Sequence, residues 1–403
     1  MVLLAGVTVN LVLGALYAWG VVKKALVTDP AWGWSNRDAA IPFTVATVSF
    51  AVMMIFAGRW QDRIGPRYVA MLGGVMFGSG LIASSFAKTP LLMALTYGVI
   101  SGVGIGLAYS ATTPAAIKWF PPARKGAVTG MVVSGVGLAA VYVAPLTQFL
   151  LAKTSVAHTF QILGVGALVL ICLASLLLRN PPPGYVPTAA SQGGGSATRA
   201  TAPPRRDLDW HEMLRTGQFY VLWIMFVLSA SAGLMVIVHV ATIAKEQAGL
   251  QWGFLPVAIL AMFNTGGRIV SGFASDRLGR TRTMVLAFLL QAVNMLVFTH
   301  YTTPWLLIFA SAFTGLCFGS LFTLFPAASA DFYGVRHLGV NYGLLFTAFG
   351  VAGVLGPMLG GEVRDRFGSY SGSYMASAAM LILGVVLALV LRPPAEVKRQ
   401  NVE

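Results

Sequence analysis

The chain has 403 residues, of which 57% are hydrophobic and 10% are charged, and its formal net charge is +14. Soluble globular chains carry about 25% charged residues, so this composition excludes an ordinary soluble domain and indicates a chain that lies mostly in lipid. A positive net charge also fits a nucleic-acid-binding protein. The positions of the basic residues decide between a membrane protein and a nucleic-acid-binding protein.

Twelve apolar runs long enough to cross a bilayer follow one another, separated by charged or turn-forming clusters. The first run starts beside Met1 without a basic stretch before it, and it is too long for the apolar region of a signal peptide. The sequence therefore predicts an all-α membrane protein. The predicted transmembrane helices cover residues 2–22, 40–58, 68–87, 91–117, 126–151, 157–178, 218–244, 251–274, 283–301, 304–330, 338–361 and 373–391.

Residues 181–216 interrupt this series with a stretch rich in proline, glycine, serine and threonine. Such a composition cannot bury a core and is typical of a flexible linker. We therefore expect a cytoplasmic linker between a six-helix bundle at 1–180 and a second six-helix bundle at 217–392. Residues 393–403 are expected to form a cytoplasmic tail.

The two predicted bundles share features at a nearly constant spacing. Asp62 and Asp276 are 214 residues apart and each follows an apolar run, while Pro114 and Pro326 are 212 residues apart within apolar runs. A spacing repeated in this way indicates a duplicated unit of six helices. The predicted fold is therefore two pseudo-symmetric bundles.

The basic residues divide unequally between the two sides of the predicted membrane. With both termini in the cytoplasm, 18 of the 27 Lys and Arg residues lie in cytoplasmic segments and 8 lie in the outer loops. This bias follows the positive-inside rule and accounts for the net charge without nucleic acid. We therefore expect a multi-pass protein of the cell inner (cytoplasmic) membrane. The one basic residue deep in a span is Arg268.

Two loops carry a recognisable signature, "GRWQDRIGPR" at 58–67 after the second run and "GFASDRLGRTR" at 272–282 after the eighth. Both resemble the loop motif of the major facilitator superfamily, and they occur in the two places where that family has it. The resemblance covers nearly the whole chain. It implies secondary transport by alternating access, in which two bundles rock about a central substrate site.

Three further stretches resemble the branch that contains oxalate/formate antiporters and monocarboxylate porters. They are "GALYAWGV" at 14–21, "KWFPPARKGAVTG" at 118–130 and "NYGLLFTAFGVAGVLGP" at 341–357. In that branch an arginine of the eighth helix binds the substrate carboxylate, and Arg268 occupies this place.

The charged residues of the two signature loops are predicted to act in gating, because clusters of opposite charge can hold one of two states together. A solvated turn that merely obeys the positive-inside rule is the alternative. The predicted gating residues are Asp62, Arg63, Arg67, Asp276, Arg277 and Arg280.

Arg268 shares one helical face with Asn264 and two serines, whereas the opposite face is apolar. A charged group at this depth is costly in lipid and needs an anionic partner. None of the 13 Asp and Glu residues is expected at its depth. We predict that the substrate carboxylate is the partner, held by two parallel hydrogen bonds. A salt bridge to Asp331 or Asp276 is the alternative.

Residues on other spans complete the predicted site. His239 is the one histidine well inside a run and can carry a proton near neutrality, with Glu246 two turns further along the same face. A neutral histidine bonded within its bundle is an equally good interpretation. Tyr109 and Tyr17 can donate a hydroxyl to the substrate, although a membrane tyrosine is more often an interface anchor.

Two departures from the resembled branch bear on the substrate. Relatives that carry dicarboxylates have a second cation in the eleventh helix, where this chain has Phe349. One buried cation balances one carboxylate, so a monocarboxylate such as lactate or pyruvate is favoured. The monocarboxylate porters have an aspartate four residues before the arginine, where this chain has Asn264, so the proton must use another group.

These observations predict a proton-coupled symporter of small monocarboxylates that acts as a monomer. An exchanger of oxalate, formate or another carboxylate anion is the second candidate, and a channel or membrane receptor is a more distant one. No catalytic triad, nucleotide loop or metal-ligand cluster is visible, so neither an enzyme nor a cofactor is expected. The two cysteines, Cys172 and Cys317, lie in different apolar runs and predict packing residues.

Overall fold

The computed structural model describes the chain except for residues 29–31, 36–37, 183, 186–206, 251–253 and 393–403 and the side chains of Tyr17, Thr28, Ala140 and Phe254. Within this described part, all regular secondary structure is helical. Twelve helical segments are long and apolar enough to cross a membrane, as the sequence predicts.

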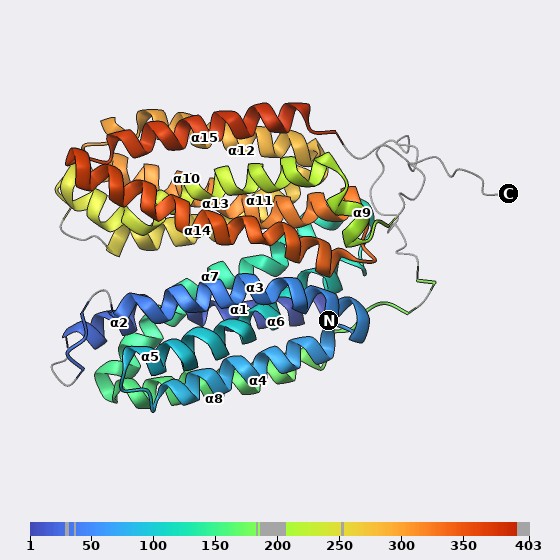
Figure 1. Cartoon of the computed structure of the whole chain (residues 1–403), viewed down its shortest axis with the longest axis horizontal. Coiled ribbons are helices and arrows are strands. Elements are labelled where there is room, and N and C mark those ends of the chain that lie inside the picture. The colour runs from blue at the N-terminus through green and yellow to red at the C-terminus, as the bar shows by residue number, and fades with distance from the viewer. Residues whose placement is uncertain (29–31, 36–37, 183, 186–206, 251–253, 393–403) are drawn as a thin grey trace.

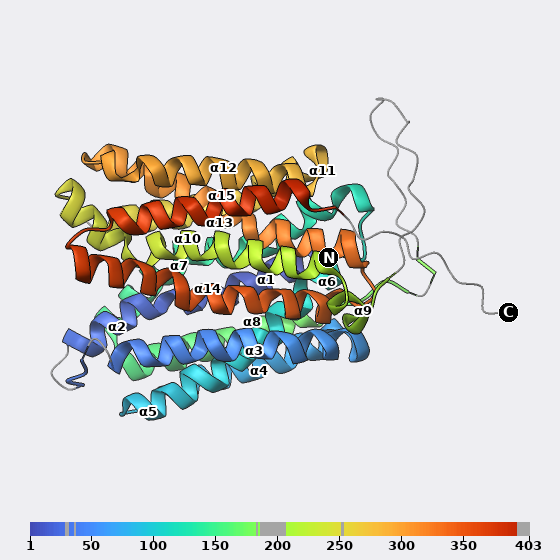
Figure 2. The same ribbon diagram turned by 45° about the horizontal axis from the view of Figure 1, so that its top comes forward.

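The first six spans are built from α1 (Val2–Leu13), η1 (Gly14–Ala18), α2 (Trp19–Thr28), η2 (Asp38–Ala40), α3 (Ile41–Ile64), α4 (Pro66–Ser84), α5 (Pro90–Met93), η3 (Ala94–Ser101), α6 (Gly102–Ile117), η4 (Pro122–Arg124), α7 (Lys125–Lys153) and α8 (Val156–Ser175). The last six are built from α10 (Gly217–Ala248), α11 (Phe254–Leu278), α12 (Arg280–Val297), η5 (Phe298–His300), α13 (Pro304–Tyr333), α14 (Leu338–Phe367) and α15 (Ser371–Val390). The two sets form two layers of roughly parallel rods (Figures 1 and 2).

Several helices extend beyond their predicted ends. The helix expected to stop at residue 58 continues to Ile64, and the one expected to stop at residue 361 continues to Phe367. Hydropathy locates only the apolar part of a helix. Hydrogen bonding continues into the polar ends, which carry arginines able to reach water or headgroups. These extensions place the charged loop residues on rigid helix ends.

Part of the predicted linker packs against the second bundle. The backbone N–H of Leu208 donates to the carbonyl of Tyr333 at 2.9 Å, and Asp207 accepts hydrogen bonds from the backbone of residues 335 and 336. The short helix α9 (Trp210–Leu214) follows, with a capping box formed by Asp209 and Glu212. Composition did not reveal this helix because the Pro- and Gly-rich residues precede it. Most of the rest of the expected linker, residues 186–206, lies outside the described residues.

The two bundles meet along α7 with α11 and along α3 with α14. Glycines make these crossings possible. A Cβ on Gly126 would lie 2.6 Å from the carbonyl oxygen of Gly272, and one on Gly58 would lie 2.1 Å from that of Gly339. A side chain at any of these positions would push the bundles apart, so the small residues set the closest approach.

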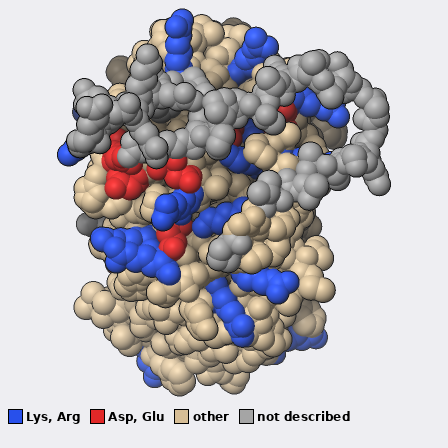
Figure 3. All heavy atoms as spheres, turned by 90° about the vertical axis from the view of Figure 1, so that its right-hand side faces the viewer, with Lys and Arg blue, Asp and Glu red and all other residues tan. Residues whose placement is uncertain are grey.

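We call the end of the molecule where α1 begins and α15 finishes the basic end (Figure 1). Seen from this end, Lys and Arg side chains gather around a smaller group of carboxylates (Figure 3). The glycine crossings between the bundles lie in the half of α7 and α14 nearer this end, whereas a Cβ on Gly353, further along α14, would meet no described atom within 4 Å. The glycine-mediated contacts between the two bundles therefore lie toward the basic end.

Candidate functional site

Arg268 sits where α11 crosses α7 and α13. Glycines on α11 allow this approach, since a Cβ on Gly267 would lie 2.0 Å from the carbonyl oxygen of Leu316 on α13. A Cβ on Gly130 of α7 would in turn lie 2.3 Å from the carbonyl oxygen of Arg268. The side chain is therefore enclosed, and only 2% of Arg268 is exposed.

The guanidinium is held by neutral groups on three elements. Its Nε donates to Oδ1 of Asn264 at 3.1 Å, one turn earlier on the same helix. Its Nη1 donates to the carbonyl oxygen of Val133 on α7, at 2.5 Å. Its Cζ lies 4.5 Å from the ring centroid of Phe322 on α13, in cation–π geometry. Contacts from both bundles thus fix the arginine.

Arg268 forms no ion pair with a described residue. The two carboxylates weighed as alternative partners are bound elsewhere, Asp331 to Lys125 and Arg280, and Asp276 to Arg280. The Nη2 group of Arg268 likewise donates to no described residue, although a guanidinium has five N–H donors. A buried positive charge with unused donors can bind an anion strongly, because little water screens it.

Aromatic side chains from both bundles surround this charge. Phe346 on α14 lies 6.0 Å from Tyr109 on α6 and 5.2 Å from Phe349, measured between ring centroids. Phe349 lies 5.2 Å from Phe322, the ring that covers Arg268. The structure therefore brings Arg268, Asn264, Tyr109 and Phe349 into one region, and their role in binding substrate stays a prediction.

Tyr342 on α14 belongs to the same region and was missed in the sequence. Its hydroxyl interacts electrostatically with Tyr109 and with Arg268, and its ring lies 5.7 Å from that of Phe346. The signal was available, because Tyr342 precedes Phe349 by seven residues, two helical turns on the same face. Phe322 was also missed, although Phe318, Phe322 and Phe325 form a stripe at helical spacing.

His239 and Glu246 lie apart from Arg268. On α10 His239 stands about 33 Å from the basic end, and on α11 Arg268 stands about 15 Å from it, at about 1.5 Å per residue. The ring of His239 is bonded to the carbonyl of Pro357, at 3.1 Å, and to the hydroxyl of Tyr370, at 3.3 Å. Glu246 forms a two-point ion pair with Arg364.

Both of these helix α10 residues therefore lie between the central arginine and the opposite end. The arrangement of His239 matches the alternative of a histidine bonded within its bundle. Their proton-carrying roles stay predictions. The backbone of Tyr17 is in η1, but its side chain lies outside the described residues.

The basic end holds the two signature aspartates in equivalent places. Asp276, at the end of α11, accepts hydrogen bonds from the backbone N–H groups of Gly126 and Ala127, both at 2.8 Å. Asp62, at the end of α3, accepts one from Val340 at 3.1 Å. Each carboxylate thus caps the first turn of a helix in the other bundle, where the helix dipole favours negative charge.

Cations add to both caps. Arg280 bonds to Asp276 at 2.6 Å and to Asp331 at 2.8 Å, and Lys125 binds Asp331 across the bundle boundary at 3.1 Å. Lys118 lies 3.7 Å from Asp62, and burial lowers the pKa of this lysine although Asp62 opposes the shift. These ion pairs of Lys118 and Lys125 were not predicted, because nothing local shows which helix end a loop lysine will face.

The three remaining predicted gating residues, Arg63, Arg67 and Arg277, are exposed, and none of them forms an ion pair with a described residue. The structure thus separates the six predicted residues into a bonded group, with Asp62, Asp276 and Arg280, and an exposed group. Their gating function stays a prediction.

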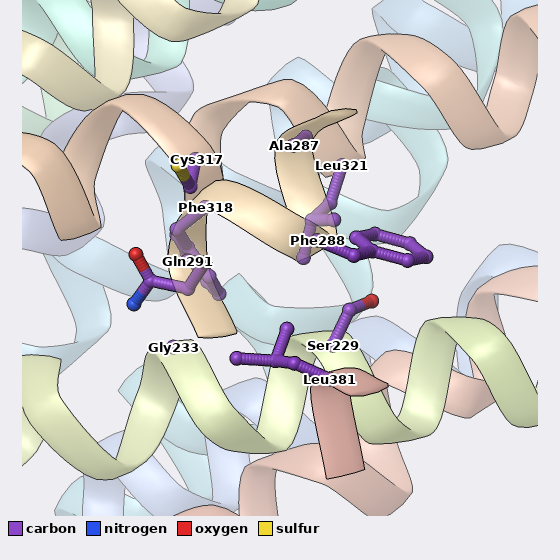
Figure 4. A pocket seen from close by; sticks show the side chains of 9 residues that line it. All are labelled: Ser229, Gly233, Ala287, Phe288, Gln291, Cys317, Phe318, Leu321 and Leu381. Atoms are coloured by element: carbon purple, nitrogen blue, oxygen red, sulfur yellow. The ribbon is translucent and has the colours of Figure 1, made fainter. Parts of the chain in front are cut away.

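A void of about 10 Å³ lies inside the second bundle, among α10, α12, α13 and α15 (Figure 4). It has room for about one water molecule and does not reach Arg268. It is therefore a packing defect, not a substrate site. Its lining residues are Ser229, Gly233, Ala287, Phe288, Gln291, Cys317, Phe318, Leu321 and Leu381.

Twelve spans in two bundles, with a buried arginine that forms no ion pair with a described residue, are the architecture of a multi-pass membrane protein. Residues 2–293 and 266–403 match the family model of the Major Facilitator Superfamily, so the chain belongs to that superfamily. It is therefore a secondary transporter and not an enzyme.

Similar proteins extend over nearly the whole chain. The chain is 28% identical over 397 residues to the oxalate:formate antiporter of Oxalobacter formigenes, covering 97% of this chain and 90% of that protein. It is 26% identical over 390 residues to monocarboxylate transporter 13 of Rattus norvegicus, covering 94% and 86%. A double-tryptophan mutant of XylE superposes with a TM-score of 0.77 at 16% identity, covering 98% and 96%, which supports the fold.

Proposed function

We propose that the protein carries small monocarboxylates, of the size of lactate or pyruvate, together with a proton. The observation that supports this most directly is the burial of Arg268 without a carboxylate among the described residues. A guanidinium in the middle of a span costs about 2.5–3.5 kcal/mol even on a mild insertion scale. A substrate carboxylate offsets that cost each time it binds.

The substrate carboxylate would bind the unused Nη2 and the second hydrogen of Nη1 of Arg268. The contacts to Asn264 and Val133 already orient the planar group, so little side-chain entropy is lost on binding. Tyr109 and Tyr342 place hydroxyl donors nearby for a carboxylate oxygen or a 2-hydroxy group. Phe346 and Phe349 would face the short alkyl end.

Alternating access would use the capped helix ends as a latch. Asp62 and Asp276 join the bundles at the basic end, so alternating access would have the opposite end open in this state. With the positive-inside orientation, this state faces outward. Inward opening would require both caps to break. The free energy needed to break both caps separates the outward-facing and inward-facing states by a barrier.

Among the described residues no carboxylate binds Arg268 that could carry the proton, and Asn264 stands where the monocarboxylate porters have an aspartate. His239 and Glu246 lie on the side from which a substrate would enter this state. Either can pass a proton to the entering anion, or the proton can travel on the substrate as the neutral acid.

Counterflow in proteoliposomes tests the substrate class. Vesicles loaded with unlabelled lactate should accumulate labelled lactate transiently, and external lactate, pyruvate or acetate should compete better than oxalate. Vesicles without protein and vesicles with the Arg268→Gln variant are the controls. Absence of lactate counterflow in vesicles that show oxalate counterflow would contradict the proposal.

Exchange of oxalate, formate or another carboxylate anion is the second candidate. It is supported by the similarity to the oxalate:formate antiporter over 97% of the chain. An exchanger moves labelled substrate only when an anion is present on the other side, whereas a symporter also drives net uptake into empty vesicles. Net lactate uptake into empty vesicles therefore separates the two candidates.

A further inference from the structure

A groove of about 390 Å³ lies at the basic end between α7 of the first bundle and α11 of the second. Its walls are mostly apolar, and two arginines stand at its rim, one from each bundle. The lining residues are Phe120, Ala123, Arg124, Ala127, Val128, Met131, Phe273, Asp276 and Arg277.

The rim of this groove carries positive charge that is exposed and able to bind an anion. Arg124 and Arg277 are both exposed, and neither forms an ion pair with a described residue. The carboxylate of Asp276 does not cancel them, because it is bound to Arg280 and to two backbone N–H groups of α7. The rim therefore presents two guanidinium groups to an anion.

The apolar wall extends away from this rim into the membrane. Phe273 on α11 is 50% exposed and lies one turn before Arg277, and Met131 on α7 lies two turns after Arg124. From Arg124 to Met131 the helix rises about 10 Å, at about 1.5 Å per residue. An anionic head at the rim and a hydrocarbon chain along the wall would fill such a groove.

We propose that this groove binds one anionic phospholipid and that the bound lipid stabilises the closed basic end. The lipid phosphate would bridge Arg124 and Arg277, and an acyl chain would cover Phe273 and Met131. The two arginines belong to different bundles, so a single phosphate holding both joins the bundles across their boundary. A ligand that binds only the closed arrangement shifts the population toward it.

A free phosphate anion would use the same arginines, but it would make no contact with the apolar wall formed by Phe273 and Met131. A long-chain lipid is favoured because the wall and the rim belong to one groove at the end of the membrane spans. This inference requires only the fold and not any particular substrate, so its failure would leave the proposed transport activity untouched.

Native mass spectrometry of the purified chain tests the binding, with phosphatidylglycerol and phosphatidylcholine titrated separately. Phosphatidylglycerol should bind at one preferred site. Arg124→Gln and Arg277→Gln should each weaken this site about fivefold, the effect of one arginine near an anionic lipid surface. Arg59→Gln is the matched control, because Arg59 is exposed at the basic end but outside the groove, and it should bind as the unaltered chain does.

The Phe273→Ser variant and competition by inorganic phosphate separate a lipid from a free anion. The variant should weaken phosphatidylglycerol binding, and millimolar phosphate should not displace the lipid. Equal binding of phosphatidylcholine, an equal loss in Arg59→Gln, or full displacement by phosphate with no effect of Phe273→Ser would overturn the proposal.

The effect on conformation is measured with spin labels at exposed positions 68 and 282, one in each bundle near the basic end, after replacement of both cysteines by serine. Phosphatidylglycerol nanodiscs should increase the short-distance population relative to phosphatidylcholine nanodiscs, and Arg277→Gln should remove the increase. An unchanged population despite lipid binding would overturn the stabilising role.

Discussion

The two halves of the molecule match at the basic end and differ at the centre. Asp62 and Asp276 both cap a helix of the other bundle, at the same place in each repeat. At the same 214-residue spacing, however, the equivalent of Arg268 is Met54 and the equivalent of Asn264 is Phe50. The duplicated feature is the one that closes the bundles, whereas the charged site exists in one half only.

This contrast has a physical reason. A latch that must hold two bundles together benefits from two equivalent contacts, one on each side of the boundary. A buried cation is costly, and a second cation at the position of Met54, which is fully buried, would repel the first in a medium of low dielectric. One arginine in one half is therefore the arrangement suited to a singly charged substrate.

The largest effect is expected from removing the asymmetric charge. Arg268→Gln should abolish carboxylate counterflow, because the neutral amide leaves the substrate anion without a counter-ion. Arg268→Lys should also be poor, since an ammonium cannot form the planar two-point contact. Labelled lactate counterflow measures both, with the amount of inserted protein and its helical content as controls. Normal lactate uptake by Arg268→Gln would refute the central claim about this site.

The next effect should show that the two latches are unequal. In Asp276→Asn one oxygen becomes an NH₂ group, which cannot accept from Ala127, and the bond to Arg280 loses its charge. In Asp62→Asn the remaining oxygen can still accept from Val340. Loss of charged hydrogen bonds should raise the basic-end-open population about tenfold for Asp276→Asn and less for Asp62→Asn.

Spin-label distances across the basic end measure these populations, with labels at positions 68 and 282. An equal shift in the two variants would mean that the additional bonds of Asp276 contribute nothing to closure. A larger shift in Asp62→Asn would reverse the order and mean that the Asp62 cap, with its ion pair to Lys118, is the stronger latch.

The comparison of halves also shows what the sequence could predict. The twelve spans, the repeat and the isolation of Arg268 follow from apolar runs and charge positions along one chain. The partners that close the basic end could not be found this way. Asp276 binds the backbone N–H groups of Gly126 and Ala127, and a backbone N–H is present at nearly every residue, so the sequence does not mark it. Likewise, the Val133 carbonyl that orients Arg268 carries no mark in the sequence.

A third, smaller effect is expected on substrate selectivity when a substitution adds a second positive charge to the central site. Phe349→Lys should weaken lactate transport and increase oxalate transport, because the new cation lies near the ring of Phe322 that covers Arg268. Competition by oxalate against labelled lactate measures the change, and Phe349→Leu is the control of neutral charge. If the unaltered chain already exchanges oxalate better than lactate, counting buried cations does not predict the substrate here.

The smallest effect is expected on proton coupling, through residues of the second bundle, which also contains Arg268. An anion moving inward alone works against an inside-negative potential, at about 2.3 kcal/mol per charge per 100 mV, and one proton makes the step electroneutral. His239 and Glu246 are the candidate carriers. His239 is nearer in depth to Arg268, while Glu246 is held by Arg364 at the opposite end.

We therefore expect His239→Ala to flatten the pH dependence of lactate uptake more than Glu246→Gln does. Uptake into proteoliposomes with an imposed pH gradient and an internal pH dye measures it, and Arg364→Gln controls for loss of the ion pair alone. Lactate entry without acidification would indicate an exchanger or uniporter. If both variants keep full coupling, neither His239 nor Glu246 carries the proton, and α10 is only a wall of the path. The proton then crosses on the carboxylate as the neutral acid.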